Sequence, residues 1–170
     1  TVFLPFTPRW KRGAKDERGI RFEFFRYAPL DALHRIGYMT GMQNDLRLQP
    51  ANYLLGPALV IGGIARLTAI LKRERVDFIH AHWCVPNGLI ALAARKLSGA
   101  TCPVIASCPG SDVRVLSTSG VVGRILARYL SGSNLITCNS SDLRDDLVKL
   151  GVPAEGVNLV PYGVSHRGVN

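Results

Sequence analysis

Two histidines and a cysteine stand close together in His80-Ala-His82-Trp83-Cys84, and both residue types bind transition metals. On a strand, His80 and His82 share one face, whereas Cys84 continues that face only if the strand extends so far. No second Cys/His pair follows at the spacing of a zinc motif, so we predict no metal site. His80 suits a hydrogen bond within a sheet, and His82 suits the end of a strand.

The segment Cys108-Pro-Gly-Ser-Asp-Val-Arg114 has the Cys-to-Arg spacing of the phosphate-binding loop in cysteine-dependent phosphatases and sulfurtransferases. There a thiolate attacks, backbone N–H groups surround the phosphate, and the arginine holds two oxygens. Asp112 argues against this chemistry, because its carboxylate would stand among the phosphate oxygens, and the loop has a single glycine. Such an enzyme, using Cys108 and Arg114, stays as an alternative to a buried thiol at a strand end.

Other phosphate-binding patterns are not indicated by the sequence. No P-loop pattern occurs, and the glycines of 56–63 lie within a helical pattern rather than after a strand. Trp10-Lys11-Arg12 is the one cluster that places an aromatic residue among basic ones. We therefore predict no nucleic-acid partner.

The candidate residues stand between segments that alternate as strand and helix. Short apolar runs read as strands, and apolar residues at spacings of three and four read as helices. This alternation predicts a parallel sheet with right-handed crossovers. The expected strands are 1–6, 20–24, 77–82, 103–107, 134–138 and 157–160, and the expected helices are 52–75, 87–97, 121–130 and 141–150.

In parallel sheets of this kind, ligands bind at the carboxyl ends of the strands. The strand at 20–24 alternates apolar and charged residues, which predicts the edge of the sheet. The loops expected at the site are 82–88, 108–114, 139–141 and 161–165.

Composition bounds the class of protein. The chain has 170 residues, of which 47% are hydrophobic, and this excludes a disordered chain, a fibre and a small disulfide scaffold. Its four cysteines read as buried thiols in a reducing compartment. A net charge of +9 favours anionic partners, such as phosphates or lipid head groups.

The uncharged run 48–65 is the best candidate for a membrane span. Because Gln49, Pro50, Asn52, Pro57 and three glycines interrupt it, we expect it not to cross a membrane. No signal peptide is visible either. We expect a soluble chain that can touch a membrane surface.

Several motifs together resemble one known family. In order they are Asp77-Phe-Ile-His-Ala-His-Trp83, Pro86-Asn-Gly88, Pro109-Gly-Ser-Asp-Val113, Ile136-Thr-Cys-Asn-Ser140 and Val160-Pro-Tyr-Gly-Val164. The series is similar to the N-terminal domain of glycosyltransferase family 4, the retaining transferases with the two-domain GT-B fold. The likeness covers about residues 20–165 and is strongest after Asp77.

The resemblance implies an α/β fold, with a Rossmann-like parallel sheet and helices on both faces. Residues 1–170 would be the acceptor-side half of a GT-B fold, lacking its first strand and helix. The donor-binding domain would be absent, and the donor would be a nucleotide-sugar with no further cofactor. We therefore predict that this chain alone transfers no sugar.

The sequence departs from the family pattern in four places, one of which is the displacement of the acidic residue after Ser140 to Asp142. Pro109 stands where the family often has histidine, and it can neither donate a hydrogen bond nor transfer a proton. Tyr162 replaces a frequent asparagine, and Ser165 replaces an aspartate. Catalytic residues are therefore left unassigned.

The resemblance implies a set of acceptor-binding residues at the strand ends. Asp112 would hydrogen-bond a sugar hydroxyl or orient a neighbouring loop, and an interdomain hinge would follow β-strand 157–160. The acceptor-binding residues are His82, Trp83, Pro109, Gly110, Ser111, Asp112 and Ser140, and the hinge residues are Pro161 and Gly163.

The expected partner is a glycan or a lipid-linked acceptor. The basic loop 9–21 suits an anionic membrane, which implies a cytoplasmic protein at the inner face of the cell membrane. Strand edges left by a missing central strand would favour a homodimer or domain swap. A non-catalytic module that binds carbohydrate or lipid head groups is a further alternative.

Overall fold

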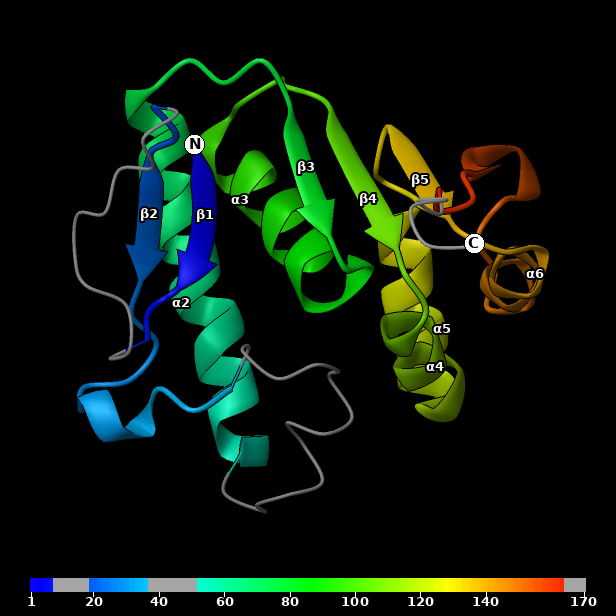
Figure 1. Cartoon of the computed structure of the whole chain (residues 1–170), viewed down its shortest axis with the longest axis horizontal. Helices are drawn as coiled ribbons and strands as arrows, with labels where there is room; N and C mark the ends of the chain where they lie inside the picture. The colour runs from blue at the N-terminus through cyan, green and yellow to red at the C-terminus, as the bar shows by residue number, and fades with distance from the viewer. Residues whose placement is uncertain (8–18, 37–51, 164–170) are drawn as a thin grey trace, which may run out of the picture.

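The computed structural model describes residues 1–7, 19–36 and 52–163, which form the α/β arrangement of Figure 1. Strands and helices alternate along most of the chain, as predicted. The strands are β1 (Val2–Pro5), β2 (Phe22–Phe25), β3 (Ile79–His82), β4 (Val104–Cys108), β5 (Leu135–Cys138) and β6 (Val157–Leu159). The helices are α2 (Asn52–Arg73), α3 (Leu89–Ser98), α4 (Ser111–Thr118), α5 (Gly120–Leu130) and α6 (Ser141–Lys149), with short turns η1 (Asp31–Leu33), η2 (Cys84–Gly88) and η3 (Ala154–Gly156).

All strand pairs are parallel, which confirms the predicted class of sheet. The strands form two sheets, one with the order β1-β2 and one with the order β3-β4-β5-β6. β2 is an outer strand, as its half-exposed pattern predicted. The doubly wound order 3-2-1-4-5-6 places a central strand between its second and fourth strands. Among the described residues no strand fills that position, so β1 and β3 have no hydrogen-bonded neighbour on their inner sides.

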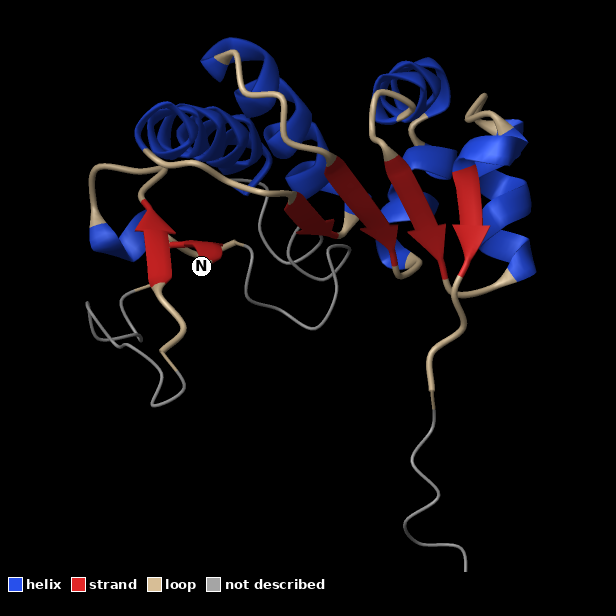
Figure 2. Ribbon diagram, turned by 90° about the horizontal axis from the view of Figure 1, so that it is seen from above, coloured by secondary structure: helices blue, strands red, loops and turns tan. Residues whose placement is uncertain are grey.

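The described helices lie on one side of the four-stranded sheet, although helices on both faces were expected (Figure 2). β4 shows this difference between the faces, because Val104, Ala106 and Cys108 are buried and the residues between them are only half-buried. On the less covered face, the Ser107 hydroxyl lies 2.7 Å from His80 Nε2 and accepts a hydrogen bond from Thr137. The hydrogen bond expected for His80 within the sheet is therefore present.

α2 is one continuous helix in which the glycines and Pro57 cause no break. The window Leu55–Arg73 has a mean hydropathy of 1.5, so by length and composition alone it could cross a membrane. Asn52, Pro57 and the three glycines, which argued against a span, are therefore not structural breaks, and Gln49 and Pro50 lie outside the described residues. α2 packs on α3, β1 and β2, and a Cβ atom at Gly62 would lie 2.8 Å from the Arg26 carbonyl oxygen. Its glycines allow this close approach of the two backbones.

α4 is a helix where the sequence predicted a polar loop up to Arg114. It begins at Ser111, and Val113 and Leu116 turn into the core. α5 packs closely against it, because a Cβ atom at Gly123 would lie 1.8 Å from the Leu116 carbonyl oxygen. The two helices form the crossover from β4 to β5.

Candidate functional site

The predicted site loops leave the sheet at the same edge. His82 pairs in register with Ser107, and Cys108 pairs with Cys138, so β3, β4 and β5 end side by side. The loops that follow are therefore neighbours. This places His82, Trp83, Pro109, Gly110, Ser111, Asp112 and Ser140 in one region, as the rule for parallel sheets predicted.

Trp83 has an unusual backbone conformation at the end of β3. Its φ of 69° lies in a region that bulky residues rarely adopt, and such residues gather at functional sites. Hydrogen bonds hold the conformation on both sides: Asn87 Nδ2 donates to the His82 carbonyl, and the Gly88 N–H donates to the Trp83 carbonyl. The Trp83 ring stacks on the exposed His82 ring, with centroids 6.4 Å apart. The two rings form an aromatic pair at the carboxyl edge of the sheet.

The Asp112 side chain connects the loops that follow β3 and β4. Its side chain is completely buried, and its two oxygens accept backbone N–H groups from Cys84 at 2.7 Å and from Gly110 at 3.0 Å. Charge-assisted hydrogen bonds of this kind are strong, so the carboxylate holds the two loops together. These contacts match the second of the two predicted roles for Asp112, the orientation of a neighbouring loop. The Asp112 side chain points inward. Its other predicted role, a hydrogen bond to a sugar hydroxyl, stays a prediction.

A cluster that the sequence did not predict lies under the site. The sulfur atoms of Cys84 and Cys108 and a carboxylate oxygen of Asp112 lie within 4.8 Å of one another, and all three side chains are buried. Hydrogen bonding to Cys108, burial and the nearby Asp112 carboxylate raise the pKa of the Cys84 thiol far above its ordinary value. The three side chains form a packed polar cluster beneath the loops.

The alternative of a cysteine-dependent phosphatase needs Cys108 and Arg114 around an open cradle. Cys108 is only 1% exposed and faces Cys84, whereas Arg114 lies exposed on α4. The loop thus does not present the thiol to a phosphate ester. This arrangement contradicts the proposed nucleophile and agrees with a buried thiol at the strand end.

Two helices begin at the same edge as the aromatic pair. Gly110, with φ of 135°, makes the turn into α4, a conformation that glycine adopts readily. The Ser140 hydroxyl caps α6 by accepting the Leu143 N–H at 3.4 Å. Asn139 Nδ2 donates to the Pro109 carbonyl at 3.4 Å and links the two loops. Each of the two helices already carries an acidic residue in its first turn, Asp112 in α4 and Asp142 in α6, so this edge suits a hydroxylated molecule.

The remaining predicted residues are only partly described. Pro161 and Gly163 lie exposed after β6, where the hinge was predicted. Ser165 lies outside the described residues, and so do residues 9–18 of the basic loop. Their expected roles stay predictions.

The fold defines the structural class to which the chain belongs. The chain superimposes over 99% of its length on 47% of the structure entitled lipopolysaccharide outer core galactosyltransferase WaaB, apo form, with a TM-score of 0.53 and 16% identity. This likeness shows the α/β fold of a GT-B glycosyltransferase. The family model for Glycosyltransferase Family 4 matches residues 2–167. The chain therefore belongs to glycosyltransferase family 4.

Two curated relatives match parts of the chain. N-acetyl-alpha-D-glucosaminyl L-malate synthase of Bacillus anthracis is 21% identical over 61% of this chain and 27% of its own length. An uncharacterised glycosyltransferase of Methanocaldococcus jannaschii is 35% identical over 46% of this chain and 22% of its own length. The chain thus spans about a quarter of the length of these relatives.

Sequence reasoning missed the connection of Asp112 to Cys84. The available signal was Gly110-Ser-Asp112 directly after a strand, because small residues followed by an acid are typical of the first turn of a helix. Which N–H groups the carboxylate would accept depends on the neighbouring loop, and a local pattern does not contain that information.

Proposed function

We propose that this chain is the acceptor-binding part of a retaining glycosyltransferase, which moves a sugar from a nucleotide-sugar to an acceptor. The observation that carries the proposal is the His82–Trp83 pair, presented at the carboxyl edge of the sheet by a backbone that Asp112 and Asn87 hold in place. Membership of glycosyltransferase family 4 supports the reaction class. Aromatic rings beside polar helix ends suit the apolar faces and the hydroxyl groups of a sugar.

For the acceptor, we propose an anionic or lipid-linked molecule. The net charge of +9 favours a partner that carries negative charge. The name of one relative pairs a sugar with L-malate, and the name of the structural neighbour refers to lipopolysaccharide. We propose further that the protein works in the cytoplasm at the inner face of the membrane, where such acceptors are reached through a basic surface.

In the proposed mechanism this chain contributes positioning. Retention at the anomeric carbon requires donor and acceptor to be held face to face, while the departing diphosphate is stabilised. Pro109 supplies no proton-transfer group at its position, and we propose that the residues of this edge orient the acceptor hydroxyl. Stabilisation of the diphosphate belongs to a donor-binding domain, and we propose that residues 1–170 alone transfer no sugar.

Transfer assays test this function. Purified full-length protein is incubated with UDP- and GDP-sugars and with soluble glycans, L-malate or lipid-linked sugars, and products are identified by mass spectrometry. We expect one donor–acceptor pair to give a glycoside with the anomeric configuration of the donor. An inverted product would overturn the retaining mechanism, and glycan binding without any turnover would instead support the non-catalytic module.

A further inference from the structure

Three side chains of metal-binding types meet beneath the site loops. The Cys84 and Cys108 sulfur atoms and an Asp112 carboxylate oxygen lie within 4.8 Å of one another, and all three side chains are buried. Among the described residues, no other group of three histidine, cysteine or acidic side chains is gathered in this way. Thiolates and carboxylates are ligands that Zn²⁺ accepts in proteins. Because a Zn–S bond is about 2.3 Å long, two sulfur atoms on one ion lie at most about 4.6 Å apart, so small side-chain movements complete the site.

The cluster gathers acidic groups, and its carboxylate has no cationic partner in the described part of the chain. Asp112 takes part in none of the ion pairs found there. Its counterparts are neutral N–H groups, which Cys84 and Gly110 donate, one to each carboxylate oxygen. Each oxygen thus keeps a further lone pair for another partner. A divalent cation would bind such a lone pair and balance the buried negative charge.

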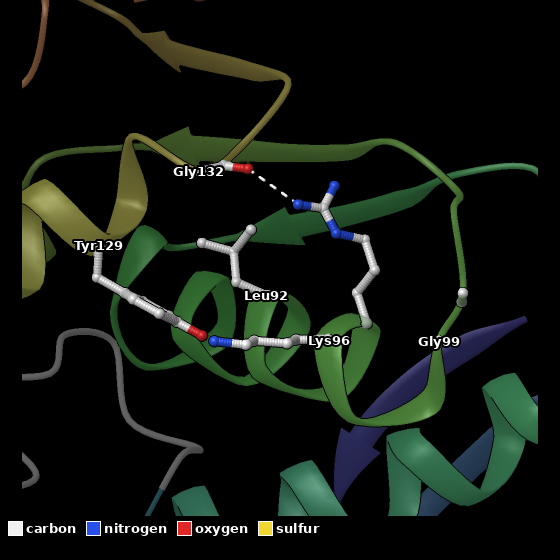
Figure 3. A pocket seen from close by; sticks show the side chains of 7 residues that line it. Leu92, Lys96, Gly99, Tyr129 and Gly132 are labelled. Atoms are coloured by element: carbon white, nitrogen blue, oxygen red, sulfur yellow. Dashed lines mark hydrogen bonds between the residues drawn. The ribbon is translucent and has the colours of Figure 1, made fainter.

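Other polar places in the described structure suit a cation less well. A cavity of about 350 Å³ between the last turns of α3 and α5 is lined by Arg95 and Lys96, and the Lys96 side chain extends toward the Tyr129 hydroxyl (Figure 3). The positive charge of this cavity repels metal ions. His80 is hydrogen-bonded to Ser107 on the less covered face of the sheet and lies outside the cluster. The cluster beneath the loops is therefore the place for a metal ion.

We propose that Cys84, Cys108 and Asp112 bind a Zn²⁺ ion, which ties the loop after β3 to the end of β4 and the start of α4. On binding, each thiol releases its proton to solvent, and the two sulfur atoms and the carboxylate oxygen bond to the ion. The ligands come from segments far apart in the sequence, so the spacing of zinc motifs did not predict them. The proposal rests on the proposed function only in its purpose, which is to hold the backbone of Trp83 at the acceptor site.

Metal analysis of the full-length protein tests the site without any nucleotide-sugar. Untagged protein is produced in medium with added Zn²⁺ or Co²⁺ and purified without a chelator, and its metal content is measured by atomic absorption. We expect at least about one ion per chain, and a lower melting temperature after a chelator has removed it. The Co²⁺ form should show the charge-transfer absorption of cobalt–thiolate bonds, which identifies sulfur ligands in the unmodified chain.

Single variants locate the ion. Cys84→Ala and Cys108→Ala should each weaken Co²⁺ binding by at least about 10–100-fold, since even the loss of a residue that only supports a metal ligand has an effect of this size. Both should also lose the cobalt–thiolate absorption. The matched control Cys102→Ala removes a buried thiol that lies outside the cluster and should leave the metal content and the cobalt spectrum unchanged. Circular dichroism checks that each variant is folded.

Four results would overturn the metal site. They are the absence of metal from protein produced with added Zn²⁺ or Co²⁺, a cobalt spectrum without thiolate absorption, unchanged metal binding in folded Cys84→Ala and Cys108→Ala, and an equal loss in Cys102→Ala. The cobalt spectrum of the unmodified chain decides the question even where a cysteine variant does not fold. Failure of sugar transfer by zinc-loaded protein would count against the proposed function and not against the metal site.

Discussion

At the scale of single residues, Asp112 determines how the site loops stand. Its buried carboxylate accepts N–H groups from both the β3 and the β4 loop. Asp112→Asn keeps the shape but turns one acceptor into a donor that faces an N–H group. We expect the free energy of unfolding to fall by about 2–3 kcal/mol, because a buried group loses its partner. Urea unfolding measures this, and the control Ser111→Ala, at a half-buried position, should change it by less than about 0.5 kcal/mol.

Trp83 has a backbone conformation that is unfavourable for a bulky residue, although its ring belongs to the proposed acceptor site. Its φ of 69° is costly for any residue with a Cβ atom and less costly for glycine. Trp83→Gly should therefore be more stable than Trp83→Ala by about 1 kcal/mol, while both lose the ring. Thermal unfolding of the two variants side by side checks this. Equal stability would show that the backbone stores no strain.

The Cys84 thiol gives the stability a pH dependence. Contact with Cys108, burial and Asp112 raise the pKa of Cys84 above its ordinary value of 9.0, so the folded thiol stays neutral where the unfolded one ionises. The neutral Cys84 thiol contributes fully to the free energy of unfolding below pH 9. Above pH 9 this free energy falls by about 1.4 kcal/mol per pH unit. Urea unfolding between about pH 7 and about pH 10 should show this fall. Cys84→Ala should reduce the dependence of the unfolding free energy on pH. Part of this dependence should remain, because burial also raises the pKa of Cys138.

At the scale of elements, the packing of α4 on α5 depends on one glycine. A Cβ atom at Gly123 would collide with the Leu116 carbonyl at 1.8 Å, so the helices would have to separate. Gly123→Ala should lower the free energy of unfolding by about 2–3 kcal/mol despite the better helix propensity of alanine. Gly156 has open space around it, and Gly156→Ala is the matched control with a change near zero. A neutral Gly123→Ala in calorimetry would contradict the close packing.

Strands could be predicted from the sequence to within about two residues, because short apolar runs between turn residues are a strong local signal. β4 was expected at 103–107 and is Val104–Cys108. α4 was missed because only two of its residues, Val113 and Leu116, carry the apolar spacing of a helix. The separation of β1-β2 from β3-β4-β5-β6 could not be predicted from local patterns, since pairing is set by tertiary packing.

The positions of the site residues could likewise be predicted only in part from local sequence patterns, and the rest depends on tertiary packing. The carboxyl-edge rule placed His82, Trp83 and Ser140 correctly in space, because parallel strands aim their ends in one direction. The inward turn of Cys84 and its contact with Cys108 depend on the backbone at Trp83. Such an unusual conformation has no signature in the residue types that surround it.

At the scale of the whole molecule, the chain presents two different surfaces. The carboxyl edge of the sheet carries the aromatic pair and two helix N-termini, and α5 carries exposed apolar side chains with Arg124 and Arg128 along one margin. In Figure 1, α4 and α5 extend past the tip of β4, so the helical pair adjoins the edge that holds the site.

We propose that the carboxyl edge of the sheet binds the acceptor and not the donor. Steady-state kinetics of full-length protein, with the donor–acceptor pair found in the transfer assay, test it most directly through Trp83→Ala and His82→Ala. Each variant should raise the acceptor KM at least tenfold, which equals about 1.4 kcal/mol of lost binding, and leave the nucleotide-sugar KM within about twofold. An increase in the nucleotide-sugar KM with an unchanged acceptor KM would contradict the claim.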